Sequence, residues 1–337
     1  MNIRVTDPFN AAADPALPTL VAALTPETAR HEFKRRLPRF SGAGRLRLRE
    51  IRVVRHKPGK RCVVEYDVEI RPVTGSPTDA TLIGKVRARR SGNEALRQLE
   101  MIWNAGFAAD HPDGIFVPEP VGVISAFQMW FQRKAPGVTA TTLLTGPEGV
   151  ALARRIATAA HKLHQANLTT EREHTMADEL RILHECLARV AALQPEWAQR
   201  LGRVLTAAEK LGGSFTPPRT CGIHRDFYSS QVIVDGAQLC LIDFDLFCRG
   251  DPGLDVGNFI GHMIEAGLRK PAWAAAQARA AQELEDCFVE LTGAAARASV
   301  RAYTTLTLVR HVYLSTQFPE RAHTTEALLE LCERRLD

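Results

Sequence analysis

The stretch from Cys221 to Asn258 constrains this 337-residue chain more than any other part of the sequence. Two short runs rich in β-branched and other apolar residues, Gln231 to Val234 and Leu239 to Phe244, flank the dipeptide Asp235-Gly236. Asp and Gly both tolerate a positive φ, so this dipeptide predicts a tight turn between two strands. The stretch is therefore expected to form a β-hairpin.

The register of this hairpin brings oxygen-bearing side chains to its open end. Counting outward from the turn places Gln231 opposite Ile242 or Asp243. Asp226 lies in the loop just before the first strand. An amide and two carboxylates are thus expected close together.

These residue types suit the transfer of a phosphoryl group assisted by a metal ion. Such chemistry needs a carboxylate near the attacking hydroxyl and oxygen ligands that hold Mg²⁺ against the nucleotide phosphates. The sequence supplies them in order: His224-Arg225-Asp226, an amide five residues later, and Asp243-Phe244-Asp245 twelve residues beyond the amide. A surface hairpin flanked by unrelated acids is the simpler alternative, but it does not account for that order.

The same segments resemble the catalytic and metal-binding segments of the kinase superfamily. The continuation Gly250-Asp251-Pro252-x-x-Asp255 resembles, in particular, the aminoglycoside phosphotransferase and choline kinase family. This resemblance implies an α+β, two-lobed protein-kinase-like fold, with a small β-rich N-terminal lobe and a larger, mainly helical C-terminal lobe. It also implies Mg²⁺ and ATP as cofactors, with GTP not excluded, and a small-molecule acceptor with a hydroxyl group.

Each polar residue of the hairpin region takes a role under this resemblance. Asp226 is expected to be the general base, and Asp243 to bind Mg²⁺ between the phosphates. Gln231 is the second expected metal ligand, although the family more often has Asn there; the extra methylene changes the reach by about 1.5 Å. Asp251 and Asp255 flank the start of the next helix, where Asp is a favourable cap, and Asp255 is expected to tether the catalytic loop.

A basic turn is expected in the N-terminal half of the chain. From Arg45 to Ile70 apolar residues recur with period two, which predicts two strands joined around Pro58-Gly59. Lys57, Lys60 and Arg61 surround this turn. Their side chains, with exposed backbone N–H groups of the turn, would suit polyphosphate oxygens. A solvated basic turn is the alternative.

The third predicted strand, Thr81 to Ala88, contains Lys85 where the family's phosphate-pairing lysine would fall. A helix follows, with Ser91 or Asn93 as its N-cap. Glu100 is the expected partner of Lys85, because its spacing of fifteen residues resembles that of the family.

The domain boundaries follow from changes in pattern along the chain. Residues 1–38 are expected to form a helical cap, with one amphipathic helix from Pro18 to Arg36. The pattern changes from β-rich to helical near residue 136, and the resemblance implies that residues 39–135 are the nucleotide-binding lobe and residues 136–337 the catalytic and acceptor-binding lobe, with a helical insert at about 171–212. By resemblance, adenine bonds to the main chain at Arg133 and Ala135, next to the boundary.

Composition and charge narrow the function further. Residues 1–137 contain 22 Lys and Arg against 14 Asp and Glu, and this basic half fits a triphosphate better than nucleic acid, because no known nucleic-acid-binding motif accompanies it. We see no secretory signal and no apolar run of membrane-spanning length, and the seven scattered cysteines favour reduced thiols in a cytoplasm. The oligomeric state is not indicated.

The sequence favours an ATP-dependent phosphotransferase that acts on a sugar, amino sugar or amino alcohol. A protein kinase would need a peptide-docking segment after Asp243, and the chain reaches Asp251 too soon for one. A non-catalytic, kinase-like nucleotide-binding protein is the remaining alternative, and only Gln231 supports it.

Overall fold

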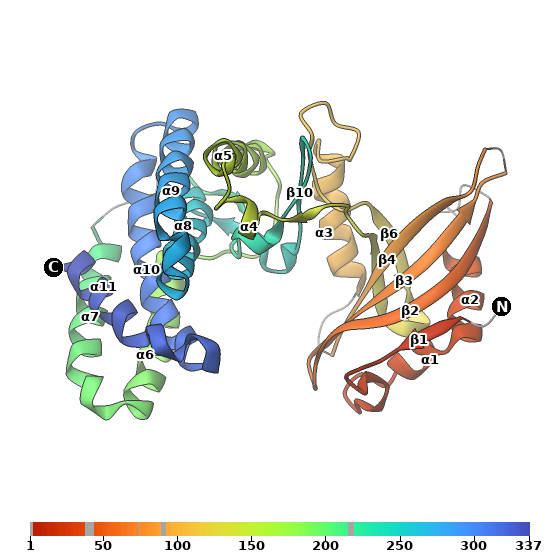
Figure 1. Ribbon diagram of the computed structural model, residues 1–337, viewed down its shortest axis with the longest axis horizontal. Helices are drawn as coiled ribbons and strands as arrows, with labels where there is room; N and C mark the ends of the chain where they lie inside the picture. Colours follow the sequence, from red (N-terminus) through yellow and green to blue (C-terminus); the bar gives the residue numbers. More distant parts are fainter. Residues whose placement is uncertain (1–2, 38–43, 74, 89–91, 215–218) are drawn as a thin grey trace. The chain divides into compact units, whose positions relative to one another are not determined.

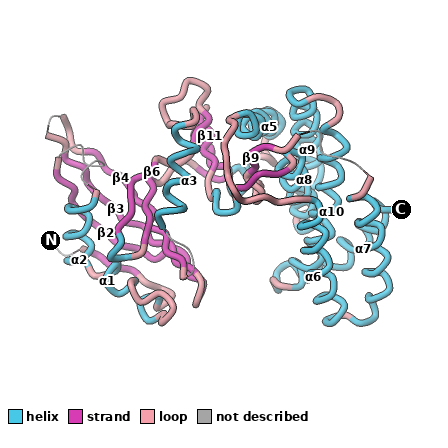
Figure 2. The backbone as a smooth tube through the Cα atoms, turned by 180° about the vertical axis from the view of Figure 1, so that it is seen from behind, coloured by secondary structure: helices cyan, strands magenta, loops and turns pink. Residues whose placement is uncertain are grey.

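The computed structural model describes residues 3–37, 44–73, 75–88, 92–214 and 219–337. The chain divides into two compact units, Met1–Pro136 and Gly137–Asp337 (Figure 1). The first unit is rich in strands and the second is mainly helical, as the backbone tube in Figure 2 shows. The expected α+β class is therefore confirmed.

A six-stranded sheet forms the frame of the first unit, in the order β1-β2-β3-β4-β7-β6. β1 runs parallel to β2, and the other neighbours are antiparallel. Alternating burial along β3 shows that its even-numbered residues face the core, as period two predicts. The strands of this unit are β1 (Arg4–Thr6), β2 (Arg45–Lys57), β3 (Arg61–Arg71), β4 (Thr78–Arg87), β5 (Ile115–Phe116), β6 (Pro120–Ile124) and β7 (Met129–Arg133).

The N-terminal segment differs from the single helix that the sequence predicted. It contains β1, the 3-10 turn η1 (Ala11–Ala13) and two helices, α1 (Leu20–Leu24) and α2 (Pro26–Arg36). Pro26 causes the break: it lacks an N–H to continue α1, and its fixed φ suits the first position of α2. The prediction of one helix from Pro18 to Arg36 was therefore wrong.

Helices cover both faces of this sheet (Figures 1 and 2). α1 and α2 cover one face, and α3 (Gly92–Asn104) lies on the other. Asn93 lies inside α3 and is not its cap, while Ser91 falls outside the described residues. A further 3-10 turn, η2 (Ser125–Phe127), joins β6 to β7.

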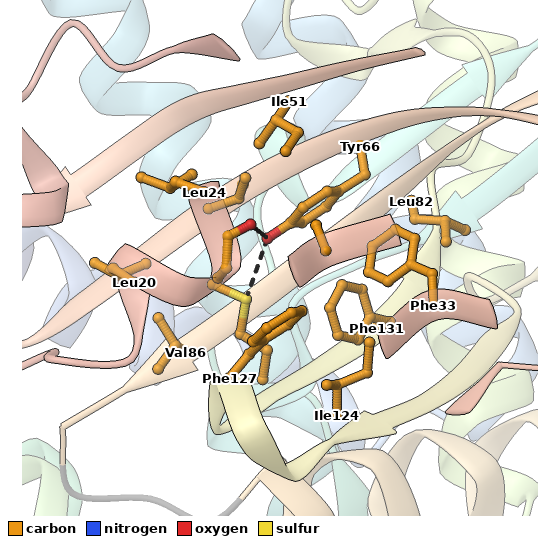
Figure 3. Close-up of a cluster of buried hydrophobic side chains, with 14 of the residues drawn as sticks. Leu20, Leu24, Phe33, Ile51, Tyr66, Leu82, Val86, Ile124, Phe127 and Phe131 are labelled. Atoms are coloured by element: carbon orange, nitrogen blue, oxygen red, sulfur yellow. Dashed lines mark hydrogen bonds between the residues drawn. The ribbon is translucent and has the colours of Figure 1, made fainter. Parts of the chain in front are cut away.

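The core of the first unit lies between the sheet and α1 and α2 (Figure 3). The ring of Tyr66 packs against Phe33 and Phe131, with centroids 4.9 and 5.6 Å away. Its buried hydroxyl donates to the carbonyl oxygen of Ala23 at 3.2 Å, which supplies the partner that a buried polar group needs. The N-terminal segment thus completes the core of the sheet.

The hairpin of the second unit has the predicted turn. β10 (Val232–Asp235) and β11 (Gln238–Leu241) are antiparallel, with Val234 opposite Leu239. The turn contains Gly236 at φ 53°. The other strands of this unit are β8 (Val138–Thr139), which pairs with β10, and β9 (Cys221–Ile223) and β12 (Cys248–Gly250), which pair with each other.

The rest of the second unit is a helical bundle (Figure 1). The helices are α4 (Ala140–Leu143), α5 (Gly149–Gln165), α6 (Met176–Leu193), α7 (Ala198–Gly212), α8 (Pro252–Arg269), α9 (Pro271–Thr292), α10 (Ala296–Thr316) and α11 (Thr325–Leu336). The 3-10 turns are η3 (Pro195–Trp197), η4 (Ser229–Gln231), η5 (Phe244–Leu246) and η6 (Pro319–Thr324). In the described part of the chain, no helix combines the length and the apolar character needed to cross a membrane.

Helices α8 and α10 pack closely because of glycines on α8. A Cβ at Gly257 would lie 2.6 Å from the Cβ of Tyr303, and one at Gly253 would lie 2.1 Å from the Oγ of Ser299. Only glycine permits such an approach. This packing brings residues of α10 close to the start of α8, and thus to the loop that α8 supports.

Candidate active site

Asp255, on the first turn of α8, holds the loop that follows β9. Its carboxylate accepts the backbone N–H groups of His224 at 2.8 Å and Arg225 at 2.6 Å, and its Oδ2 lies 2.9 Å from Nε2 of His164. The Asp255 side chain, which makes all three contacts, is not exposed to solvent. The prediction that Asp255 tethers this loop is confirmed, and its partner His164 is a buried structural residue.

His224 joins the loop to the hairpin. Its Nε2–H donates to the carbonyl oxygen of Ile242 at 2.9 Å, and its ring packs 4.7 Å from that of Phe244. The residue is fully buried. These contacts agree with the predicted structural role of His224 and fix the two segments that carry Asp226 and Asp243.

Two strained backbone positions flank the same site. Arg225 has φ 69° and Asp243 has φ 66°, and both lie in the left-handed region. Such a conformation costs about 1–3 kcal/mol for a residue other than glycine, and it persists where the surroundings enforce it. The hydrogen bond from Arg225 N to Asp255 is one such constraint, so the site is held in a fixed geometry.

Asp226, Gln231 and Asp243 lie close together, as the hairpin register predicted. The backbone N–H of Ile242 donates to the carbonyl oxygen of Gln231 at 2.9 Å, so Gln231 stands opposite Ile242. Gln231 ends the turn η4 and does not begin the strand; its side chain is buried and hydrogen-bonded to the Asp226 carboxylate.

Burial raises the pKa of Asp226, and the negative charge of Asp243 raises it further. Electrostatic interactions with His224 and Arg310 and the hydrogen bond from Gln231 act in the opposite direction on this pKa. A carboxylate with a raised pKa is a stronger proton acceptor, which suits a general base at neutral pH.

The donors at the hairpin fit a magnesium ion better than a transition metal. Mg²⁺ takes oxygen ligands and commonly uses only one or two carboxylates together with water and substrate phosphates. Asp243 supplies a carboxylate and Gln231 an amide oxygen. Within the described residues, no group of three His, Cys, Asp or Glu side chains could hold a metal by itself.

Arg310, on α10, was missed by the sequence analysis. Its Nη2 donates to Oδ1 of Asn258 at 2.5 Å and its Nη1 to Oε2 of Glu179 at 3.4 Å. The Nδ2 of Asn258 in turn donates to the carbonyl oxygen of Phe227 at 2.9 Å. Arg310 is thereby positioned beside the Asp226 loop, although nothing in the local sequence around it indicates this.

Lys85 of the first unit lies on the face of the sheet that α3 covers. It pairs across strands with Trp130, and its Nζ lies 4.9 Å from the centroid of that indole ring. Glu100 is exposed on α3. The pairing of Lys85 with Glu100 stays a prediction.

Cationic residues form a row across three strands near Lys85. Lys57 lies opposite Arg61, and Arg61 lies opposite Arg87 on β4. Like charges directly opposite one another destabilise a sheet, and a bound anion would offset their repulsion. Arg87, two residues after Lys85 on the same face, was not among the predicted residues; its period-two spacing from Lys85 was the available signal.

In the β2–β3 turn, a backbone N–H group is already hydrogen-bonded to a carboxylate of the chain itself. Oδ2 of Asp14 accepts the N–H of Gly59 at 2.9 Å and lies 2.8 Å from Nε2 of His56. The N–H of Lys60 donates to the carbonyl oxygen of Lys57. The bond from Gly59, followed by that from His56, lowers the pKa of Asp14. The expectation that these N–H groups are available to phosphate was therefore wrong, and only the side chains remain candidates.

The main chain after β7 limits how adenine could bind. The N–H of Arg133 donates to the carbonyl oxygen of Glu119 at 2.9 Å, and the N–H of Lys134 donates to that of Thr81 at 2.8 Å. Arg133 can therefore offer only its carbonyl oxygen, and Ala135 is the next residue whose N–H could serve.

Substituting Asp255 by Asn is expected to destabilise the second unit. An amide cannot accept both backbone N–H groups and the His164 ring, and losing hydrogen bonds to a buried charge costs about 2–3 kcal/mol. Urea unfolding should show a lower midpoint for Asp255→Asn than for Asp235→Asn, a control at the exposed hairpin turn. Equal midpoints for the two variants would contradict the tether.

Residues 77–303 match the model of the phosphotransferase enzyme family. Choline kinase from Cryptosporidium parvum has a similar structure, with a TM-score of 0.61 and 9% identity, covering 92% of this chain and 94% of that one. No curated protein matches the sequence.

Two further structures with bound nucleotides have the same fold. A thermostable mutant of aminoglycoside phosphotransferase APH(4)-Ia, in ternary complex with ADP and hygromycin B, has a TM-score of 0.60 and 15% identity and covers 86% of this chain and 94% of that one. An amicoumacin kinase in complex with AMP-PNP and Ca²⁺ has a TM-score of 0.55 and 13% identity, with 84% and 88% covered. At this identity the similarity shows the protein-kinase-like fold alone.

Proposed function

This chain belongs to the phosphotransferase enzyme family, and from that premise we propose that it transfers the γ-phosphate of Mg-ATP to a hydroxyl group of a small molecule. The acceptor belongs to the sugar, amino sugar or amino alcohol class. The observation that carries the proposal is the cluster of half-buried Asp226 and Asp243 with buried Gln231, which a strained and tethered backbone holds together.

The proposed reaction assigns one step to Asp226. The acceptor oxygen attacks the γ-phosphorus, the bond from that phosphorus to the β,γ-bridging oxygen breaks, and ADP leaves. The proton of the acceptor hydroxyl passes to the Asp226 carboxylate, whose raised pKa favours this transfer. Asp243 and Gln231 would hold Mg²⁺, which neutralises charge on the phosphates when it is bound.

The first unit is proposed to bind the nucleotide. Lys85 would pair with phosphate oxygens, and the row of Lys57, Arg61 and Arg87, with Lys60 in the adjoining turn, would add positive charge. In this scheme Glu100 orients Lys85 when nucleotide is present. The carbonyl oxygen of Arg133 and the N–H of Ala135 would bond to adenine.

ADP release tests the proposal directly. The purified chain is incubated with Mg²⁺, with ATP or GTP, and with amino sugars, neutral sugars, sugar acids, amino alcohols and macrolides. Acceptor-dependent ADP release that stops when EDTA is added is the expected result. Mg²⁺-dependent nucleotide binding without turnover of any acceptor or water would instead identify a non-catalytic nucleotide-binding protein.

Lys85→Ala is expected to weaken the use of ATP by about 10- to 100-fold in kcat/KM, because a charge-assisted contact to phosphate is lost. Steady-state ADP release measures the effect, with Lys34→Ala on α2 as the control. If Lys85→Ala retained the parent's kcat/KM and nucleotide affinity, Lys85 would have no part in phosphate binding.

A further inference from the structure

Two histidines of the second unit lie beside the loop that holds Asp226. Tyr228, two residues after Asp226, stacks on His262 of α8, with ring centroids 4.5 Å apart and an interplanar angle of 15°. His262 meets His311 of α10 edge to face, also at 4.5 Å between centroids. The roles proposed above use none of these three side chains.

Both imidazoles are neutral. Burial lowers the pKa of His262 to about 3, and the remaining contributions come from Arg310, Arg321 and Arg269. Burial likewise lowers the pKa of His311 well below its ordinary value, with the same arginines and His262 acting in the same direction. Arginines are thus the charged groups that act on this cluster.

One of those arginines, Arg321, has no carboxylate partner among the residues that the structure describes. Arg310 bonds to Glu179, and Arg269 bonds to Glu265 at 2.6 Å. Arg321, in η6, lies over the ring of Phe318 at 4.8 Å, and in the described part of the chain its buried Nε has no hydrogen-bond partner. Phe318 is itself exposed. Arg321 is therefore a cation near the surface that can pair with an anionic ligand.

A second polar atom of the cluster also lacks a partner. His311 is only 1% exposed, and among the described residues its Nε2 makes no hydrogen bond. Leaving a buried polar atom unsatisfied is unfavourable, and such atoms in native proteins commonly mark a bound ligand or water. The cluster therefore combines two nitrogens without a partner among the described residues, Nε2 of His311 and Nε of Arg321, with a stacked aromatic pair.

We propose that the cluster of Tyr228, His262, His311 and Arg321 binds the phosphate acceptor, and that this acceptor is a hydroxylated compound with an anionic group. The inference rests on the proposed function and replaces the acceptor range given there by hydroxylated acids, such as sugar acids. Arg321 pairs with the anionic group, and the neutral imidazoles contact hydroxyl groups. A polyamine would be repelled by Arg321, for which the described residues supply no carboxylate partner.

Chemical labelling of His262 measures binding without requiring turnover. The full chain is treated with diethyl pyrocarbonate, and the labelling rate of each histidine is followed by peptide mass spectrometry. The probes are three-member sets of matched skeletons: glucuronate, glucose and glucosamine, and then glycerate, glycerol and serinol. We expect an acidic member to protect His262 at least about tenfold better than its amine counterpart. Exposed His184 serves as the internal control and should be labelled equally throughout.

Variants of Arg321 separate a direct role from a loss of folding. Arg321→Ala should abolish protection by the acidic probes, Arg321→Lys should keep most of it, and Arg334→Ala, at an exposed position on α11, should leave it unchanged. Thermal unfolding is measured for each variant. If no acidic probe protects His262, or if the amine of a set protects it equally well, the inference is wrong.

ADP release on the same samples distinguishes the two proposals. Turnover of an amine that exceeds turnover of its acidic counterpart would overturn the inference while the proposed function stands. Protection by acidic probes with no ADP release from any compound would overturn the proposed function, and the cluster would then be a binding site for hydroxy acids without an acceptor role.

Discussion

Replacing Asp226 by Asn is expected to lower kcat by about 10²- to 10⁴-fold and to leave the affinity for ATP unchanged. The amide has the same shape and can still contact Gln231, but it cannot accept the proton of the acceptor hydroxyl. Steady-state ADP release gives kcat, and equilibrium titration with Mg-ATP gives the affinity. Asp235→Asn, at the exposed hairpin turn, is the matched control and should behave as the parent.

The same substitution is expected to stabilise the fold at neutral pH. The pKa of Asp226 is raised in the folded state by burial and by Asp243, so the ionised carboxylate destabilises the fold above the ordinary pKa of Asp, about 4. Asn removes that charge, and a higher unfolding temperature at pH 7 should follow. The gain should disappear at pH 3, where the parent's carboxyl group is protonated. Full turnover by Asp226→Asn would remove Asp226 from its role, and lower stability at pH 7 would point to a structural one.

This opposition between activity and stability is common at active sites. In this chain it has identifiable causes in Asp226 itself and in the left-handed backbone of Arg225 and Asp243. Asp255 offsets part of the cost through its bonds to the loop. The tether and the strained residues therefore act together, and weakening the tether should loosen the site.

The hairpin and its polar end were predictable because their signals are local. Asp235-Gly236 sets the turn, period two sets the faces, and register then determines which residue lies opposite Gln231. The position of Lys85 on a strand was predictable for the same reason, and its role toward phosphate stays a prediction. The break between α1 and α2 was equally readable, since Pro26 is a strong signal for the first position of a helix, but the apolar periodicity on both sides of it concealed the break.

Contacts between distant segments were not predictable from local pattern. The Asp14 carboxylate accepts the N–H of Gly59, which lies 45 residues further along the chain, and no periodicity or turn signal links the two residues. Arg310 reaches the Asp226 loop through Asn258 because glycines on α8 admit α10 closely. A sequence motif reflects the backbone conformation and burial of a single strand or turn, whereas these contacts depend on how separate elements pack against each other.

The roles of the two proposed metal ligands can be separated by their charge. Asp243→Ala is expected to abolish Mg²⁺-dependent nucleotide binding, because it removes the carboxylate that would face a divalent ion, the largest charge in such a site. Gln231→Asn should be tolerated or should raise turnover, since a neutral oxygen is kept and its reach becomes the shorter one that is more usual in the family.

The test is a Mg²⁺ titration of ADP release and of nucleotide binding for both variants beside the parent and Asp235→Asn. Gln231→Asn also shortens the side chain whose amide donates a hydrogen bond to Asp226. The pH–rate profile of this variant should therefore shift, while its requirement for Mg²⁺ changes little. Gln231→Leu removes both the bond to Asp226 and the ligand oxygen at nearly constant volume, and so measures the loss of the whole amide. An inactive Gln231→Asn together with an active Asp243→Ala would invert the assignment. Asp245, two residues further on, would then be the main metal ligand, and the left-handed backbone at Asp243 would have to be explained by packing alone.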